Sequence, residues 1–115
     1  MNIDALFSLE IIEVLENFID RKRPPEEIRH KLDLSYKIED QSVTIFEIRP
    51  RWDNYEEKME CFVAKATFVK NQNIWKIFWQ RSDAKWHQYM LKSKVNTLEE
   101  FITLVEEDKN GCFWG

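Results

Sequence analysis

Residues 61–79 read CFVAKATFVKNQNIWKIFW, and this stretch decides the fold. Apolar side chains alternate with other residues in both halves, which is the period of two expected of half-buried β-strands. The alternating residues are Phe62, Ala64, Ala66 and Phe68 in the first half, and Trp75, Ile77 and Trp79 in the second. The polar segment Asn71-Gln72-Asn73 separates the halves. Because this connection is so short, the two strands are predicted to be adjacent and antiparallel.

Two more strands are predicted ahead of this pair. Over residues 32–39 the apolar residues Leu32, Leu34, Tyr36 and Ile38 alternate with polar ones. Residues 40–42 are polar and suit a turn, after which residues 43–49 continue as the next strand. Short connections between successive strands favour an antiparallel meander. The sheet is therefore predicted to contain four strands, or five.

An amphipathic helix is predicted ahead of the sheet, from a cap at Asp4 to about Arg23. Apolar residues recur three or four positions apart, and acidic residues fall on the other side. These apolar residues are Ile3, Phe7, Ile11, Val14, Leu15, Phe18 and Ile19. The pair Pro24-Pro25 ends the helix, because the residue before a proline avoids helical backbone. Proline followed by two acids then favours a short second helix over residues 25–28.

A last helix is predicted near the C-terminus. Thr97 and Glu100 have the spacing of a capping box, in which each side chain bonds the other residue's backbone N–H. The residues that would face inward are Leu98, Phe101, Ile102 and Val105. The apolar tail at residues 110–115 is expected to dock on the protein. These elements define an α+β fold, with an antiparallel sheet, a long N-terminal helix and a C-terminal helix.

The two faces of the sheet are predicted to differ. The small side chains of Ala64 and Ala66 would let a helix lie close, so the N-terminal helix is placed across that face. The opposite face is predicted to be mixed in character, with aliphatic side chains beside charged ones. Its residues are Val43, Ile45, Val63, Val69, Phe78, Glu47, Arg49, Lys65 and Lys76. Because aliphatic rows are rarely left in water, this face is expected to be covered, for example by a second subunit.

The composition is that of one folded domain spanning residues 1–115. Hydrophobic residues make up 43% of the chain, which excludes a disordered protein. The first residues lack the basic and apolar pattern of a signal peptide, and no apolar run is long enough to cross a membrane, so neither a signal peptide nor a membrane span is expected. Cys61 and Cys112 are too few for a disulfide framework, so they are read as free thiols of a cytoplasmic protein.

Charge is unevenly distributed along the chain. The net charge of −4 argues against general binding to nucleic acid or to anionic membranes. Residues 49–94, however, hold ten Lys or Arg against five Asp or Glu, and the acids concentrate elsewhere. Such asymmetry is typical of a binding face. It also arises when acidic residues simply occupy the outer faces of helices.

Basic and aromatic residues alternate within this segment and are the candidate ligand-binding residues. They are Arg49, Arg51, Trp52, Lys65, Trp79, Arg81, Lys85, Trp86 and His87. Cationic and aromatic side chains together stack on and bind planar or anionic ligands, including single-stranded nucleic acid. The alternative interpretation is structural: the tryptophans belong to the core, and the cations only cover them.

A catalytic interpretation rests on His87 with Asp83. A histidine acts as a general base when a partner orients it beside a substrate. The structural alternative is a salt bridge from Asp83 to Arg81 or Lys85 within a turn. No metal-ligand spacing, glycine-rich phosphate loop or nucleophile motif is present in the sequence, so neither a metal nor a cofactor is expected, and a binding protein is favoured over an enzyme.

Several segments resemble a family of small bacterial proteins known as domain of unknown function 3024. The likeness rests on residues 48–52, 64–67, 75–83, 85–89 and 111–115. It covers roughly residues 32–115, and its spaced tryptophans make it specific. The resemblance implies a small bacterial domain of about this length, and it carries no activity, ligand or site residue.

Three functions follow from these observations, in order of preference. The first is a non-enzymatic binding module with a basic–aromatic face for an anionic or nucleotide-containing ligand, or weakly for single-stranded nucleic acid. The second is an interaction protein that forms a homodimer through its sheet face. The third is a small enzyme that uses Asp83 and His87.

Overall fold

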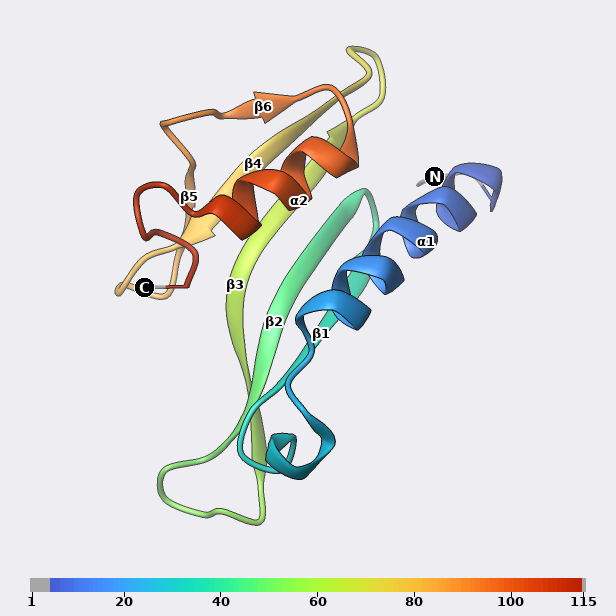
Figure 1. Cartoon of the computed structure of the whole chain (residues 1–115). Helices are drawn as coiled ribbons and strands as arrows, with labels where there is room; N and C mark the ends of the chain where they lie inside the picture. The colour runs from blue at the N-terminus through green and yellow to red at the C-terminus, as the bar shows by residue number, and fades with distance from the viewer. Residues whose placement is uncertain (1–4, 115) are drawn as a thin grey trace.

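The computed structural model describes residues 5–114 of the chain. Within that range, two α-helices lie against one face of a six-stranded sheet (Figure 1). The helices are α1 (Ala5–Lys22) and α2 (Leu98–Glu107), with a 3-10 turn η1 (Glu26–Ile28). The strands are β1 (Asp33–Glu39), β2 (Ser42–Pro50), β3 (Lys58–Val69), β4 (Ile74–Gln80), β5 (Trp86–Gln88) and β6 (Lys94–Val95). The predicted α+β class is confirmed.

The sheet is an antiparallel meander in the order β1-β2-β3-β4-β5, and β6 also pairs with β4. The four predicted strands are present, and the short segment predicted as a second helix forms η1. The additional strands β5 and β6 are three and two residues long. Neither is long enough to show a period of two in the sequence.

The helix α1 buries the predicted apolar stripe, with Ile11, Leu15 and Phe18 fully enclosed in the core. The predicted cap Asp4 and the stripe residue Ile3 lie outside the described residues. At the far end, the Arg23 guanidinium donates two hydrogen bonds of 2.8 Å to the carboxylate of Asp33 at the start of β1. This ion pair fixes where the chain turns from helix to sheet.

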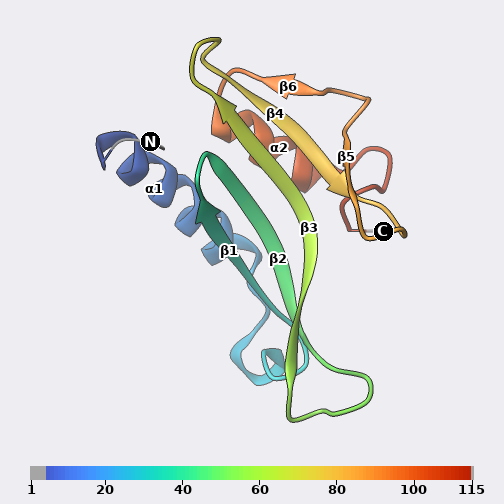
Figure 2. The same ribbon diagram turned by 180° about the vertical axis from the view of Figure 1, so that it is seen from behind.

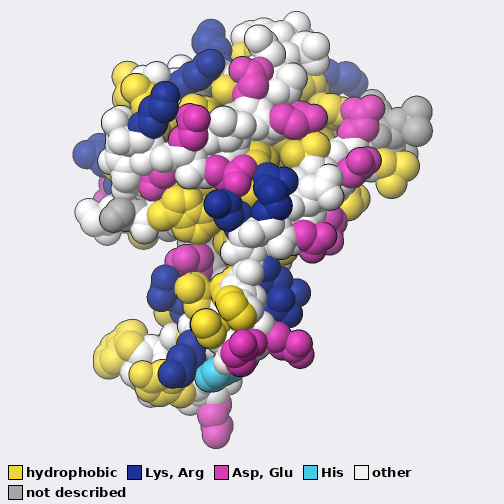
Figure 3. Space-filling model, in the orientation of Figure 1, with side chains coloured by type: hydrophobic (Ala, Val, Ile, Leu, Met, Phe, Trp, Pro, Cys, Tyr) yellow, Lys and Arg dark blue, Asp and Glu magenta, His cyan; other side chains and the backbone are white. Residues whose placement is uncertain are grey.

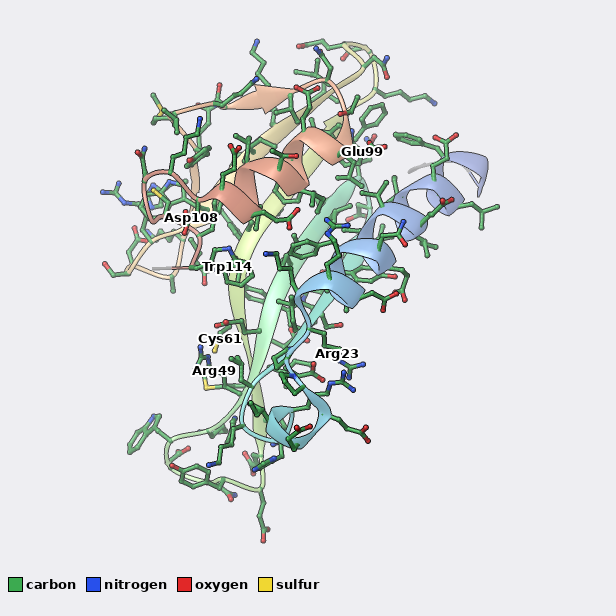
Figure 4. The ribbon with its side chains drawn as sticks, viewed as in Figure 1. Arg23, Arg49, Cys61, Glu99, Asp108 and Trp114 are labelled. Carbon is green, nitrogen blue, oxygen red and sulfur yellow. The ribbon has the colours of Figure 1, made fainter. Side chains whose placement is uncertain are left out.

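The helix α2 begins with the predicted capping box of Thr97 and Glu100 and ends at Asp108, whose backbone is left-handed. The tail that follows docks as predicted. The Asp108 carboxylate accepts the backbone N–H groups of Phe113 and Trp114, each at 3.0 Å, and the Trp114 indole donates to the carbonyl of Val105 (Figure 4). Phe113 also packs against the buried ring of Tyr89. These contacts hold the C-terminal tail against the last turn of α2.

A register shift in β3 changes which side chains face the helices. The pairing of Ile45 with Ala64 is followed by that of Phe46 with Phe62, so Val63 is an extra residue. Because successive strand residues point to opposite faces, this bulge moves Phe62 to the face opposite Ala64. The prediction that Phe62 shares a face with Ala64 is therefore wrong.

The predicted placement of the aliphatic rows is also wrong. Val43 pairs with Ala66 and Ile45 with Ala64, and paired residues share a face. Val43 and Ile45 are therefore fully buried under the helices, and Val63 is buried as well. The helix closest to β3 and β4 is α2, whereas α1 approaches β1. The N-terminal helix thus lies on the predicted face, and it shares that face with α2.

The opposite face of the sheet, here called the outer face, carries neither of the two α-helices of the described chain (Figure 2). The lower halves of β2 and β3 extend beyond both helices and form an arm, with η1 beside it (Figure 1). The connection at the tip of this arm carries the highly exposed Trp52 and Tyr55. No helix among the described residues is long and apolar enough to cross a membrane.

Candidate ligand-binding face

The centre of the outer face is an aromatic patch with two lysines lying over it. The Lys65 ammonium lies 4.8 Å from the centre of the Trp86 ring and 5.2 Å from that of Phe78. Strand pairing explains this proximity, because Lys65 is directly opposite Phe78 on β4 and β5 brings Trp86 alongside. Distances of this order allow an attractive cation–π interaction.

The second lysine, Lys37 of β1, lies over the neighbouring rings of Phe46 and Phe62 at 5.7 and 4.8 Å. The Phe62 ring in turn contacts that of Trp86, with centroids 5.8 Å apart. The rings therefore form one continuous surface across the sheet. We call these residues the outer aromatic cluster: Lys37, Phe46, Phe62, Lys65, Phe78 and Trp86.

A shallow cavity of about 300 Å³ opens beside this cluster. Its lining combines the two lysines, two aromatic rings, two hydroxyl groups and two acids. These residues are Lys37, Lys65, Phe62, Trp86, Ser42, Thr44, Glu39 and Asp40. A cavity of this size lies at the lower end of the range for small-ligand sites. It combines a positive charge, stacking surfaces and hydrogen-bonding groups.

The two lysines differ in their electrostatic surroundings. Lys37 bonds the Glu60 carboxylate at 3.2 Å and lies 3.5 Å from that of Glu39. Lys65 makes no ion pair within the described part of the chain, and its half-burial among rings lowers the pKa of its ammonium. Burial disfavours the charged form unless a counter-charge is supplied. Of the two lysines, Lys65 is therefore the one at which an anionic ligand would bind more favourably, because it would supply a missing counter-charge.

Three of the predicted ligand-binding residues lie elsewhere, on the arm. Arg49 bonds the Glu47 carboxylate, and Arg51 forms two 2.9 Å hydrogen bonds with Asp53. Trp52 is 87% exposed at the tip. Figure 4 shows Arg49 beside Cys61, well below the helices. Counter-charges are thus already present around both arginines.

Four more predicted residues gather around the turn from β4 to β5. Trp79 faces the helix side and packs on the core, with the Arg81 guanidinium 5.5 Å from its ring centre. His87 pairs with Trp79 and shares its face, while Lys85 is exposed in the turn. These four are therefore separated by the sheet from Lys65 and Trp86. Here the structural interpretation, a cation covering a core tryptophan, describes the geometry.

The Asp83 carboxylate does not bridge to Arg81 or Lys85 as the structural alternative predicted. It accepts the Lys85 backbone N–H and lies 2.9 Å from His87 Nε2. These two hydrogen bonds hold the pKa of Asp83 below its usual value. The pair is on an exposed turn, and neither residue lines the cavity beside the outer aromatic cluster. Among residues 5–114, no group of three or more His, Cys, Asp and Glu is placed to hold a metal ion.

Sequence reasoning identified Lys65 and Trp86 but missed Lys37, Phe46 and Phe62 as part of the same surface. The sequence held one sign of this surface: Lys37 is at a polar position of the first predicted strand, so it was expected to point away from the apolar face. The orientation of Phe62 depends on the bulge, and no residue type in the sequence marks where that bulge lies.

Comparison with known proteins places the chain in a family. The sequence model of the family described as Domain of unknown function (DUF3024) matches residues 6–115. No curated protein and no solved structure matches the chain. The match covers α1 as well as the sheet, the second helix and the C-terminal tail, so it is wider than the resemblance of the tryptophan-rich segments. The chain belongs to the DUF3024 family.

Proposed function

We propose that this protein is a non-enzymatic binding module whose outer aromatic cluster binds an anionic ligand with a planar ring. Nucleotides and short single-stranded nucleic acids are the ligands with this chemistry. The observation that carries the proposal is the state of Lys65, a half-buried cation among rings with no carboxylate partner in the described chain. A phosphate would supply the missing counter-charge.

The rings beside Lys65 supply the second part of the interaction. Phe62 and Trp86 are half-buried, so part of each ring stays exposed beside the lysine that lies over it, on a face that no helix of the described chain covers (Figure 2). A base that stacks on such a ring gains about 1–3 kcal/mol, without regard to sequence. Ser42 and Thr44 line the same cavity and offer hydroxyl groups to a ligand. Glu39 and Glu60 oppose anions nearby, so we expect weak binding.

The test is a fluorescence-anisotropy titration with a labelled oligothymidylate of about six nucleotides at low salt. We expect saturable binding that weakens steeply as salt rises, because phosphate contacts release counterions. Lys65→Met and Trp86→Leu should each weaken binding by about tenfold or more, the loss of one charge-assisted or stacking contact. Lys70→Met is the matched control, since it removes one exposed lysine outside the cluster.

The proposal is wrong if wild-type protein does not bind, or if Lys70→Met weakens binding as much as Lys65→Met. Competition with free nucleotide and with inorganic phosphate separates the two parts of the ligand. Nucleotide should compete better than phosphate, because only the nucleotide stacks on the rings.

Homodimerisation through the outer face is the second candidate. Phe62, Phe78 and Trp86 each keep part of their surface exposed on that face. The ammonium groups of Lys37 and Lys65 already lie over these rings, so a homodimer through this face would have to bury both cations as well. Sedimentation equilibrium decides between a 14.0 kDa monomer and a species of twice that mass.

We place the protein in the bacterial cytoplasm. Cys61 and Cys112 are both free and half-buried, which suits a reducing compartment. Alkylation of the purified protein under native and denaturing conditions should count two reactive thiols. A disulfide-linked species in freshly lysed cells would contradict this placement.

A further inference from the structure

The helix side of the sheet carries a second and larger cavity, a groove between α1 and α2 of about 650 Å³. Its floor is apolar: Ile11, Trp75 and Leu98 are buried there, and Phe68 and Val14 are half-buried. The groove is on the face opposite the outer aromatic cluster, so its occupant is independent of the proposed function. Arg21 of α1 bonds Glu106 of α2 at 3.0 Å and closes one end.

The rims of the groove are acidic. Glu10 and Glu13 of α1 line one side. Glu99 of α2, labelled in Figure 4, lines the other. All three are exposed, and none forms an ion pair within residues 5–114. Among the described residues that line the groove, Arg21 is the only basic one, and it is paired with Glu106. Figure 3 shows acidic side chains spread over this face with hydrophobic surface between them.

The dimensions of the groove suit one face of a helix. The lining residues of α1 run from Phe7 to Arg21, a distance of about 21 Å along a helix axis. A volume of about 650 Å³ over that length accommodates a row of side chains, not an entire helix. Apolar residues at positions i, i+3, i+4 and i+7 of an incoming helix form such a row, which is the usual helix-in-groove mode.

We propose that this groove binds a basic amphipathic helix of a partner protein. The apolar stripe of the partner would enter the groove, and Lys or Arg residues flanking the stripe would meet Glu10, Glu13 and Glu99. The charge complementarity selects this partner, because an acidic or neutral helix would leave the three carboxylates without counter-charges.

The test uses a fluorescein-labelled peptide of about fourteen residues, with Leu on one helical face and Lys on the other, and anisotropy as the readout. A peptide with Glu in place of every Lys is the probe for charge. We expect saturable binding of the Lys peptide and none of the Glu peptide. The variant Glu10→Gln, Glu13→Gln, Glu99→Gln should weaken binding of the Lys peptide by about tenfold, because each rim pair contributes modestly.

The matched control is Glu26→Gln, Glu27→Gln, Glu56→Gln, which removes the same charge at exposed positions outside the groove. Its affinity should stay within about twofold of the wild type, as expected of long-range charge alone. Thr103→Trp provides a test without any charge change, since Thr103 is exposed and lines the groove. Its added ring should occupy the cavity and abolish binding, while circular dichroism confirms the fold. The proposal fails if the wild type does not bind, if both triple variants weaken binding equally, or if Thr103→Trp binds normally.

Discussion

Lys65 and Trp86 meet on the outer face of the sheet, with the lysine ammonium 4.8 Å from the centre of the indole ring. The two residues come from β3 and β5, which are not neighbours; β4 lies between them. The contact therefore depends on the pairing of all three strands. It places a positive charge where burial opposes it, and a cation–π interaction offsets only part of that cost.

The first prediction concerns the stability cost of Lys65. Burial holds the pKa of its ammonium in the folded state below the usual lysine value of 10.5. At neutral pH both states are protonated, and the folded state bears the full penalty of the buried charge. Between the lowered pKa and 10.5, the unfolded chain binds more protons than the folded protein, so the contribution of Lys65 to stability increases with pH and then levels off.

Lys65→Met should accordingly be more stable than the wild type at neutral pH, and the difference should shrink as the pH rises towards 10.5 and stay constant above it. Urea denaturation of both proteins across this range measures the difference. Lys70→Met, at an exposed position, should show no such trend. A stability difference that does not change with pH would show that burial of the charged Lys65 ammonium does not destabilise the protein.

The second prediction concerns packing under α2. Ala64 and Ala66 are both fully buried, and α2 packs against β3. Ala66→Leu should lower the free energy of unfolding by about 1–3 kcal/mol, because extra methylene groups in a close-packed core force side chains off their rotamers. Chemical denaturation gives the value. Lys70→Leu adds the same side chain at an exposed position and should change stability by less than about 0.5 kcal/mol.

The sequence predicted the elements of this fold better than their faces. The stripe from Ile11 to Phe18 and the capping box at Thr97 are local patterns, and both appear in the structure. The direction of Phe62 depends on an extra residue at Val63, which is a tertiary feature. The candidate site was likewise predicted only in part, because its contacts join different strands. Lys65 and Trp86 were both predicted and do meet, whereas Lys37, which comes from β1, was missed.

The third prediction concerns the docked tail. The Asp108 carboxylate accepts hydrogen bonds from the backbone N–H groups of Phe113 and Trp114. Asp108→Ala should lower stability by roughly 1–3 kcal/mol, because bonds to a charged acceptor are lost and alanine fits the left-handed backbone poorly. Asp108→Asn is the control, since it keeps one acceptor oxygen and tolerates that backbone. Near-equal unfolding midpoints for wild type and Asp108→Ala would mean that the tail contributes nothing.

The last prediction separates the arm from the outer aromatic cluster. Arg51 and Trp52 follow Pro50, which pairs with Lys58. Lys58 precedes Lys65 by about 23 Å along β3, at the usual rise per residue. One nucleotide is too short to touch Lys65 and Trp52 together. Arg51 is moreover already paired with Asp53.

The double variant Arg51→Ala, Trp52→Ala should therefore leave the affinity for a mononucleotide unchanged, within about twofold. Trp86→Leu should reduce that affinity, because Trp86 lies beside Lys65. Equilibrium dialysis with labelled nucleotide measures both variants in the same way and does not depend on tryptophan fluorescence, which each variant alters. Loss of mononucleotide binding in the arm variant, with normal binding by Trp86→Leu, would show that the nucleotide binds at the tip of the arm and not on the outer face.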